Sequence, residues 1–222
     1  MTHPSPVASP AKAPNVDPRN RPVAPQEHEP TLAAPGAGVP RIERMVGWLQ
    51  LTLATRRGPA AASMRMRNEQ AAIHRIVQPL SSAEASARVL VPRLRGLEDS
   101  SRWWSAWMTL DHLRIVNVSI AEVITVLGGE RSPAGQVSTA AVKPSTDVGP
   151  EVLAAFDASC DAIERAVAAL PRPRSTARFA HPWFGPLDTA GWHAMSAMHM
   201  GIHRAQLEAI VRGLALRKSD QS

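Results

Sequence analysis

The sequence predicts an all-α protein, a four-helix bundle preceded by an accessory helix and a proline-rich tail. Apolar residues recur at spacings of three and four along several segments, which is the period of an amphipathic helix. No segment alternates apolar and polar residues with the period of two that a half-buried strand shows. With 222 residues, of which 44% are hydrophobic, the chain is expected to form one domain with a sizeable core, plus extensions.

Residues 1–40 are predicted to be a disordered tail. They hold half of the chain's 20 prolines and almost no large apolar residues. Such a segment cannot bury enough apolar surface to offset the entropy of ordering. Its basic and acidic side chains balance, so the formal net charge of +6 belongs to the rest of the chain.

Residues 41–79 are predicted to form an accessory helix and a basic connecting segment. Four apolar residues at helical spacing indicate a helix over 41–56 that starts after Pro40, and Gly58-Pro59 ends it. Residues 60–79 give no clear pattern. The segment is rich in arginine, and its only acids are Glu43 and Glu69. The four apolar residues are Ile42, Met45, Leu49 and Leu53, and the arginines are Arg41, Arg44, Arg56, Arg57, Arg65, Arg67 and Arg75.

Two interpretations of this basic segment stay open. The favoured one is a solvated basic face. The other is a surface that attracts phosphate or an anionic membrane. Binding of nucleic acid is not expected, because aromatic stacking platforms do not interleave with the arginines.

Residues 80–217 are predicted to contain the helical bundle. A helix over 81–97 starts at a serine cap, and Pro92 is expected to kink it. The next helix runs over 101–127 and stops at Gly128-Gly129. After a loop over 129–149, further helices are expected over 152–170 and, capped by Asp188, over 189–214. The four helices alternate up and down, or use longer crossovers.

Three histidines lie at the centres of apolar helical stripes. At 100° per residue, His112 is on the midline of one helix, and His199 and His203 share the midline of the last one. A buried imidazole costs free energy unless its nitrogens find partners. A shared divalent ion would satisfy all three side chains, and neutral nitrogen donors suit Zn²⁺, Ni²⁺ or Fe²⁺. The alternative is a set of buried histidines without metal.

Several other side chains are candidates for this site. Gln206, one turn after His203, is the candidate catalytic residue, with orientation of substrate or of a ligand as its role and a core-edge amide as the alternative. The loop that contains His181 either brings another imidazole near the metal or simply caps a turn. Cys160 is expected to be a packed small side chain rather than a nucleophile. Four aromatic residues either wall a pocket or fill the core, namely Trp104, Trp183, Phe184 and Trp192.

Three stretches resemble the DinB/YfiT superfamily over about residues 80–215. They are WSAWMTLDHL from Trp104, HPWFGPL from His181 and MHMGIHRAQL from Met198. The resemblance implies that His112, His199 and His203 ligate one metal ion in a four-helix bundle. The aromatic run from His181 is similar to that of a branch with unknown function. Unlike the thiol-dependent isomerases of this superfamily, the protein is not expected to have a sterol-carrier-like C-terminal portion.

The resemblance implies a metal-dependent enzyme with a small-molecule substrate, either a hydrolase that activates water or a transferase that uses a low-molecular-weight thiol such as mycothiol, bacillithiol or glutathione. A non-catalytic bundle that binds a small ligand or a partner helix is the alternative, and a homodimer is a candidate assembly. The start of the chain lacks the layout of a secretory signal, and no apolar run approaches the roughly 20 residues of a membrane span. The single cysteine excludes an intramolecular disulfide, so a cytoplasmic protein is expected.

Overall fold

The computed structural model describes residues 29–220. Its regular structure is mostly helical, and none of the described helices is long and apolar enough to cross a membrane. The helices are α1 (Arg41–Arg56), α2 (Pro59–Val77), α3 (Ser82–Ser86), α4 (Ala106–Gly128), α5 (Val152–Ala168) and α6 (Thr189–Ser219).

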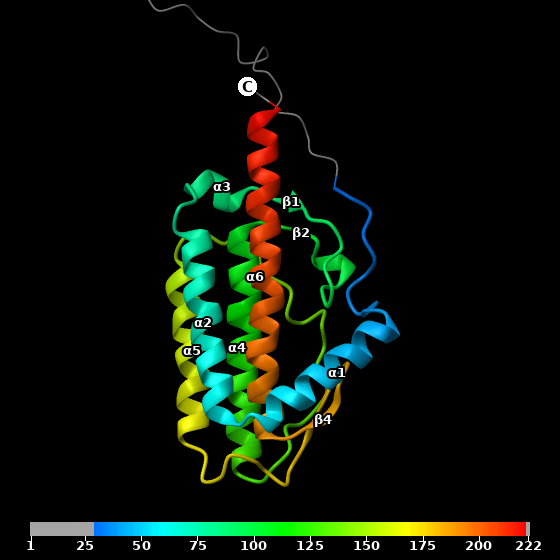
Figure 1. The fold of residues 1–222 in the computed structure, drawn as a ribbon, viewed down its shortest axis with the longest axis vertical. Coiled ribbons are helices and arrows are strands. Elements are labelled where there is room, and N and C mark those ends of the chain that lie inside the picture. Colours follow the sequence, from blue (N-terminus) through cyan, green and yellow to red (C-terminus); the bar gives the residue numbers. More distant parts are fainter. Residues whose placement is uncertain (1–28, 221–222) are drawn as a thin grey trace, which may run out of the picture. The chain divides into compact units, whose positions relative to one another are not determined.

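Helices α2, α4, α5 and α6 form a four-helix bundle, which confirms the predicted fold class (Figure 1). Helix α4 packs on α5 and α6, and α2 packs on α6 and α5. Helices α4 and α5 point the same way: Gly128 at the end of α4 lies against Leu170, which follows the end of α5. Residues 129–151 therefore cross over the length of the bundle. Of the two topologies that the sequence left open, the structure has the one with a long crossover.

The prediction for the first bundle helix is wrong. It is α2, which lies in the segment expected to connect, and the helix expected over 81–97 stops at Ser86. Ser81 and Glu84 form a capping box, but the backbone is extended at Ala87, and Pro92 disfavours helix at the residue before it. The boundary predicted at residue 80 therefore falls inside the bundle rather than at its start.

Short strands occupy parts of the helices predicted over 81–97 and 101–127, and parts of the loop that contains His181. Strand β1 (Val89–Leu90) pairs antiparallel with β2 (Trp103–Trp104), and β3 (Phe179–His181) pairs with β4 (Gly185–Leu187). Between β1 and β2 lies the 3-10 turn η2 (Asp99–Ser101). These two-residue and three-residue strands are too short to give the alternating pattern by which a strand is recognised. Because η2 and β2 occupy the residues before it, α4 starts at Ala106 instead of the predicted Ser101, and the Ser105 side chain caps it.

Part of the predicted disordered tail is described. Residues 1–28 lie outside the described residues, whereas residues 29–40 are free of helix and strand. The Ala33 N–H donates to Asp99 Oδ2 at 2.8 Å, and the Gly38 N–H donates to Glu98 Oε1 at 3.2 Å. These bonds hold the stretch before α1 against η2.

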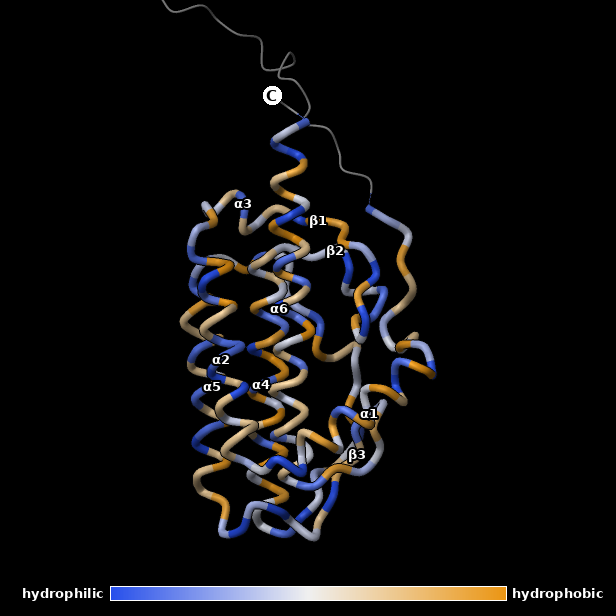
Figure 2. Tube along the Cα trace, in the orientation of Figure 1, coloured by the Kyte–Doolittle hydropathy of each residue, from blue (hydrophilic) through white to orange (hydrophobic). Residues whose placement is uncertain are grey.

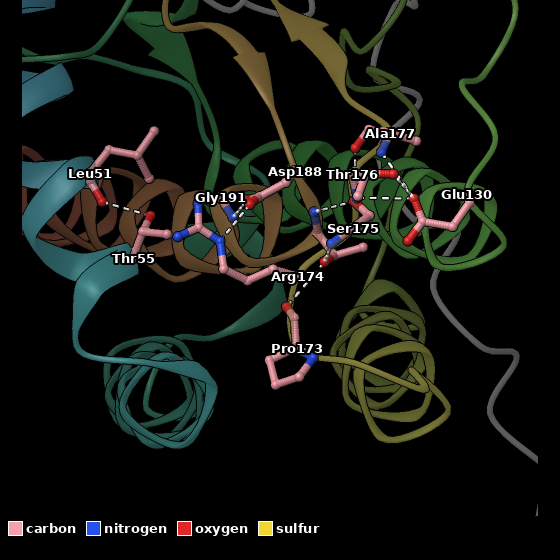
Figure 3. Close-up of polar contacts among 11 residues, drawn as sticks. Leu51, Thr55, Glu130, Pro173, Arg174, Ser175, Thr176, Ala177, Asp188 and Gly191 are labelled. Carbon is pink, nitrogen blue, oxygen red and sulfur yellow. Dashed lines mark hydrogen bonds and ion pairs between the residues drawn. The ribbon is translucent and has the colours of Figure 1, made fainter.

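Two carboxylates, those of Glu130 and Asp188, accept hydrogen bonds from the connection between α5 and α6 (Figure 3). As predicted, Asp188 caps α6: its Oδ1 accepts a hydrogen bond from the Gly191 N–H at 2.8 Å. Its Oδ2 accepts one from Arg174 Nε at 2.6 Å. Glu130, just after α4, accepts hydrogen bonds from the Thr176 and Ala177 N–H groups. These contacts fix where α6 starts and thereby the positions of the histidines along it.

Candidate metal centre

The three predicted histidines meet where α4 faces α6. His199 Nε2 lies 3.2 Å from His112 Nε2 and 3.1 Å from His203 Nε2. One nitrogen from each side chain belongs to a group whose members all lie within 4.8 Å of one another. His199 and His203 share a face of α6 because four residues separate them, which is close to one helical turn. The neighbouring helix supplies His112 from the opposite side.

The hydrogen bonds fix which nitrogens of His112 and His203 bear a proton. His112 Nδ1 lies 2.7 Å from the Val142 carbonyl oxygen, and His203 Nδ1 lies 2.7 Å from Gln206 Oε1. Both partners only accept hydrogen bonds, so each Nδ1 must be the donor. Each Nε2 therefore has a free lone pair, and both lone pairs face His199.

The described residues do not satisfy the hydrogen-bonding capacity of the three imidazoles. If His199 Nε2 had a proton, it would be shared between two acceptors, and His199 Nδ1 has no partner among the described residues although it is buried. A cation among the three Nε2 atoms would meet all three lone pairs at once. Two nitrogens bound at about 2.0–2.1 Å to one tetrahedral ion stand about 3.3 Å apart. The observed spacings are close to this value, so the residues fit a divalent ion.

Burial keeps the three imidazoles neutral. Desolvation lowers the pKa of His112 to about 4, against an ordinary value of 6.5. It also lowers the pKa values of His199 and His203 well below 6.5, and neighbouring histidines add to this effect. A neutral imidazole is the form that binds a metal ion. The cluster is therefore ready for metal at neutral pH without first losing protons.

Hydrogen bonds to the Nδ1 atoms of His203 and His112 orient these two side chains. Gln206 is fully buried, and its Nε2 donates to the Ser101 carbonyl oxygen at 2.7 Å while its Oε1 accepts from His203. On the other side, Asp111 accepts a hydrogen bond from the Ser145 N–H at 2.9 Å. This bond ties down the crossover whose Val142 carbonyl accepts from His112. Both outer contacts link a histidine to backbone that comes from a distant part of the sequence.

The Val142 carbonyl is the contact that sequence reasoning missed. A backbone oxygen in a loop gives no signal in the sequence. Asp111 is a further such contact: it is 4% exposed and pairs with Arg114. An aspartate next to a midline histidine on an otherwise apolar helix was the available signal.

A cavity of about 130 Å³ opens beside the cluster. Its walls are mostly apolar and come from α4, α6, the crossover and the β3–β4 loop. Trp104, Trp183 and Trp192 line it, whereas Phe184 packs beside Gly47 of α1. Two charged side chains also line it, the exposed Lys143 and the buried Glu98. Three of the four candidate aromatic residues thus wall a pocket.

His181 lines the same cavity but is not part of the cluster. Its Nδ1 accepts a hydrogen bond from the Trp183 N–H at 3.1 Å, and its ring stacks on Phe184 with the centroids 4.8 Å apart. Burial lowers the pKa of His181 to about 4. The residue therefore caps its own turn and also presents an imidazole to the cavity.

Two further residues lie away from the site. Cys160 is 1% exposed in the bundle core, and burial raises the pKa of its thiol to about 12. A thiol in this state is a poor nucleophile, which agrees with its expected packing role. His193 is also buried, but it hydrogen bonds with Ser63 Oγ at 3.3 Å rather than with the cluster.

Comparison with known proteins identifies a matching family and a similar solved structure. The family model described as the DinB superfamily matches residues 65–207. Among solved structures, the chain is similar to TT2238, described as a four-helix bundle protein, with 26% sequence identity and a TM-score of 0.48. That match covers 67% of this chain and 95% of TT2238. No curated protein matches the chain.

Proposed function

The chain belongs to the DinB superfamily, and from this premise we propose that it is a metal-dependent enzyme whose His112, His199 and His203 hold one divalent ion. The convergence of three neutral Nε2 atoms is the observation that supports this most. Nitrogen donors of this kind fit Zn²⁺, Ni²⁺ or Fe²⁺ and leave a coordination position free. Such an ion, when bound, lowers the pKa of a water or thiol ligand.

Gln206 is proposed to be a positioning residue. Both of its polar side-chain atoms are engaged, one with His203 and one with the Ser101 backbone. It is fully buried and therefore has no free group to offer a substrate. An amide that accepts from Nδ1 fixes the tautomer and the ring orientation of a metal-binding histidine. Of the roles considered for Gln206, orientation of a ligand is the one that these contacts favour.

The cavity limits the substrate to a compact and largely apolar group. An engineered cavity of about 150 Å³ in another protein holds one benzene molecule, and the cavity here measures about 130 Å³. Trp104, Trp183 and Trp192 contribute large apolar surfaces to its wall. The Lys143 ammonium suits a carboxylate on the substrate or on the thiol. We infer that the reacting part of the substrate enters this space and that larger parts stay outside.

The same walls favour a thiol over water as the nucleophile. Hydrolytic metal sites commonly use a carboxylate as general base. Among the described residues that line the cavity, Glu98 is the only carboxylate, and it already accepts hydrogen bonds from the Gly38 N–H and from Ser100 Oγ. The His181 imidazole also lines the cavity, but its pKa of about 4 makes it a weak base near neutral pH. A low-molecular-weight thiol needs only to lose its proton to become reactive. We therefore favour a thiol S-transferase over a hydrolase.

Elemental analysis of untagged protein tests the metal site. Wild type is expected to contain close to one divalent ion per chain, and His112→Ala and His199→Ala are expected to contain almost none. His193→Ala is the matched control, because His193 is a buried histidine on the same helix that lies outside the cluster. A wild type that stays empty under zinc and nickel titration and melts alike with and without metal would instead support the non-catalytic bundle.

Cobalt substitution tests the choice of nucleophile. The Co²⁺ protein is titrated with glutathione while its near-ultraviolet absorption is recorded. A thiolate-to-cobalt charge-transfer band that saturates with thiol is expected, because a thiol that binds the ion loses its proton. If visible cobalt bands appear but thiols leave the spectrum unchanged, the transferase proposal fails and the hydrolase takes its place.

A further inference from the structure

Helix α1 turns a row of large apolar side chains toward solvent. The exposed fractions range from 48% to 72%, and the affected residues are Ile42, Met45, Trp48, Leu49 and Leu53. Apolar residues at this helical spacing usually face a core. In α1, however, Leu51 is the only buried residue. Figure 2 shows hydrophobic positions along α1, outside the four bundle helices.

The opposite face of α1 explains why the apolar row points outward. Glu43, Gly47 and Leu51 follow one another at intervals of four residues and so share one face. Glu43 accepts hydrogen bonds from Arg93 at 2.6 Å and from the Gly96 N–H at 3.0 Å. A Cβ at Gly47 would approach the Phe184 ring to 3.1 Å, so glycine lets α1 pack closely against this ring. This face holds α1 in one rotational setting and leaves the other face without cover.

Positive charge accompanies the apolar row. Arg41, Arg44, Arg56 and Arg57 are all exposed, and none of them forms an ion pair with another described residue. Glu43, the only acid on α1, is already paired with Arg93. Arg44 lies seven residues before the buried Leu51 and so is on the packed side, whereas Arg41 and Arg56 are on the outer face. The outer face of α1 is therefore both apolar and cationic. A partner must supply negative charge and an apolar layer together.

A second copy of this chain does not meet that requirement. In an antiparallel pairing of two α1 faces, Arg41 of one chain would approach Arg56 of the other, and in a parallel pairing each arginine would meet itself. No acid is available on α1 to neutralise either arrangement, and like charges placed together oppose association. Nucleic acid supplies negative charge but no apolar layer, and Trp48 alone is not a row of stacking platforms.

We propose that the outer face of α1 docks on an anionic phospholipid surface. Amphipathic helices with arginine beside tryptophan and leucine lie in the plane of a bilayer interface, with the apolar side chains at the acyl boundary. Trp48 matches the preference of indole for this interface. The arginines gain from the negative potential of the headgroups. This docking is independent of the metal site and makes the protein a peripheral membrane protein.

Vesicle flotation with the full-length protein tests the proposal. Wild type is expected to float with vesicles that mix phosphatidylglycerol and phosphatidylcholine, and to be released as salt is raised. It should bind pure phosphatidylcholine vesicles far more weakly. Replacing Arg41 and Arg56 by glutamine should lower the affinity for anionic vesicles by about fivefold for each arginine.

Leu49→Ser is the decisive variant, with Leu216→Ser as its matched control. Leu49 and Leu216 are 54% and 67% exposed, but Leu216 lies on α6. Leu49→Ser should weaken vesicle binding at least about tenfold, whereas Leu216→Ser should leave it unchanged. Thermal melting followed by circular dichroism should be unaltered in both variants, which confirms that both fold. Wild type that fails to float at low salt overturns the proposal. A Leu49→Ser variant that binds vesicles normally but loses a dimer in light scattering also overturns it and assigns the face to a second copy.

Discussion

Replacing Gln206 by leucine should weaken both metal binding and the fold. Leucine has a similar size but removes the acceptor for His203 Nδ1 and the donor to the Ser101 carbonyl oxygen, each of which makes a 2.7 Å hydrogen bond. Leaving a buried polar group unsatisfied costs about 1–3 kcal/mol, so two such groups should lower the free energy of unfolding by roughly 2–6 kcal/mol. Loss of a contact that orients a metal ligand typically lowers metal affinity about 10–100-fold.

The assays separate these two effects. Urea unfolding of the metal-free protein gives the stability change, and competition with a chromophoric chelator gives the zinc affinity. Gln206→Glu keeps an acceptor for His203 but has no donor for Ser101, so it should recover metal affinity while the metal-free protein stays destabilised. Gln70→Leu is the control, because Gln70 bonds to Asp157 outside the cluster. A Gln206→Leu variant that binds zinc as tightly as wild type would refute the positioning role.

Two further predictions concern stability. The free energy of unfolding of the metal-free protein should fall as the pH drops below about 6.5. In the unfolded chain His112 then takes up a proton, whereas in the folded protein it stays neutral because its pKa is about 4. For this residue alone the loss approaches about 3 kcal/mol by pH 4. Urea midpoints that are the same at pH 7.5 and pH 5 would contradict it. Gly213→Ala should destabilise the protein by about 1–2 kcal/mol, since the new Cβ would lie 2.5 Å from Val89 Cγ1 and overpacking outweighs the gain in helix propensity. A higher urea midpoint would show that propensity wins.

Helical periodicity was sufficient to find the cluster. His112, His199 and His203 each occupy the centre of an apolar stripe, and a stripe on a bundle helix must face the interior. Order and spacing of these residues also predicted the family, which the match over residues 65–207 confirms. Local signals were equally reliable at the start of α6, where Asp188 caps the helix as expected. The position of each residue on its own helix depends only on neighbours close in the chain, so the sequence is sufficient to predict it.

Local signals did not identify the first helix of the bundle, for which residues 81–97 and α2 were the two candidates. Residues 81–97 offered a cap and apolar residues, but Pro92 and the positive φ of 80° at Gly96 exclude a continuous helix. The place is taken by α2, whose apolar pattern is weaker and was left undecided. Its inward side chains, such as Met66 and Ile73, are buried only because α5 and α6 lie beside them. Packing partners, rather than propensity, select which segment completes the bundle.

The surroundings of the cluster depend on contacts between distant segments. The Val142 carbonyl reaches His112 across 30 residues, and Ser101 reaches Gln206 across 105. Periodicity identifies an apolar face but not the surface that it meets. The row from Ile42 to Leu53 has the spacing of a core-facing stripe, yet the Glu43 and Gly47 contacts turn it to solvent. The chain's own pattern therefore defined the positions of the three histidines, whereas only the packing of distant segments defined their orientation, the cavity beside them and the open face of α1.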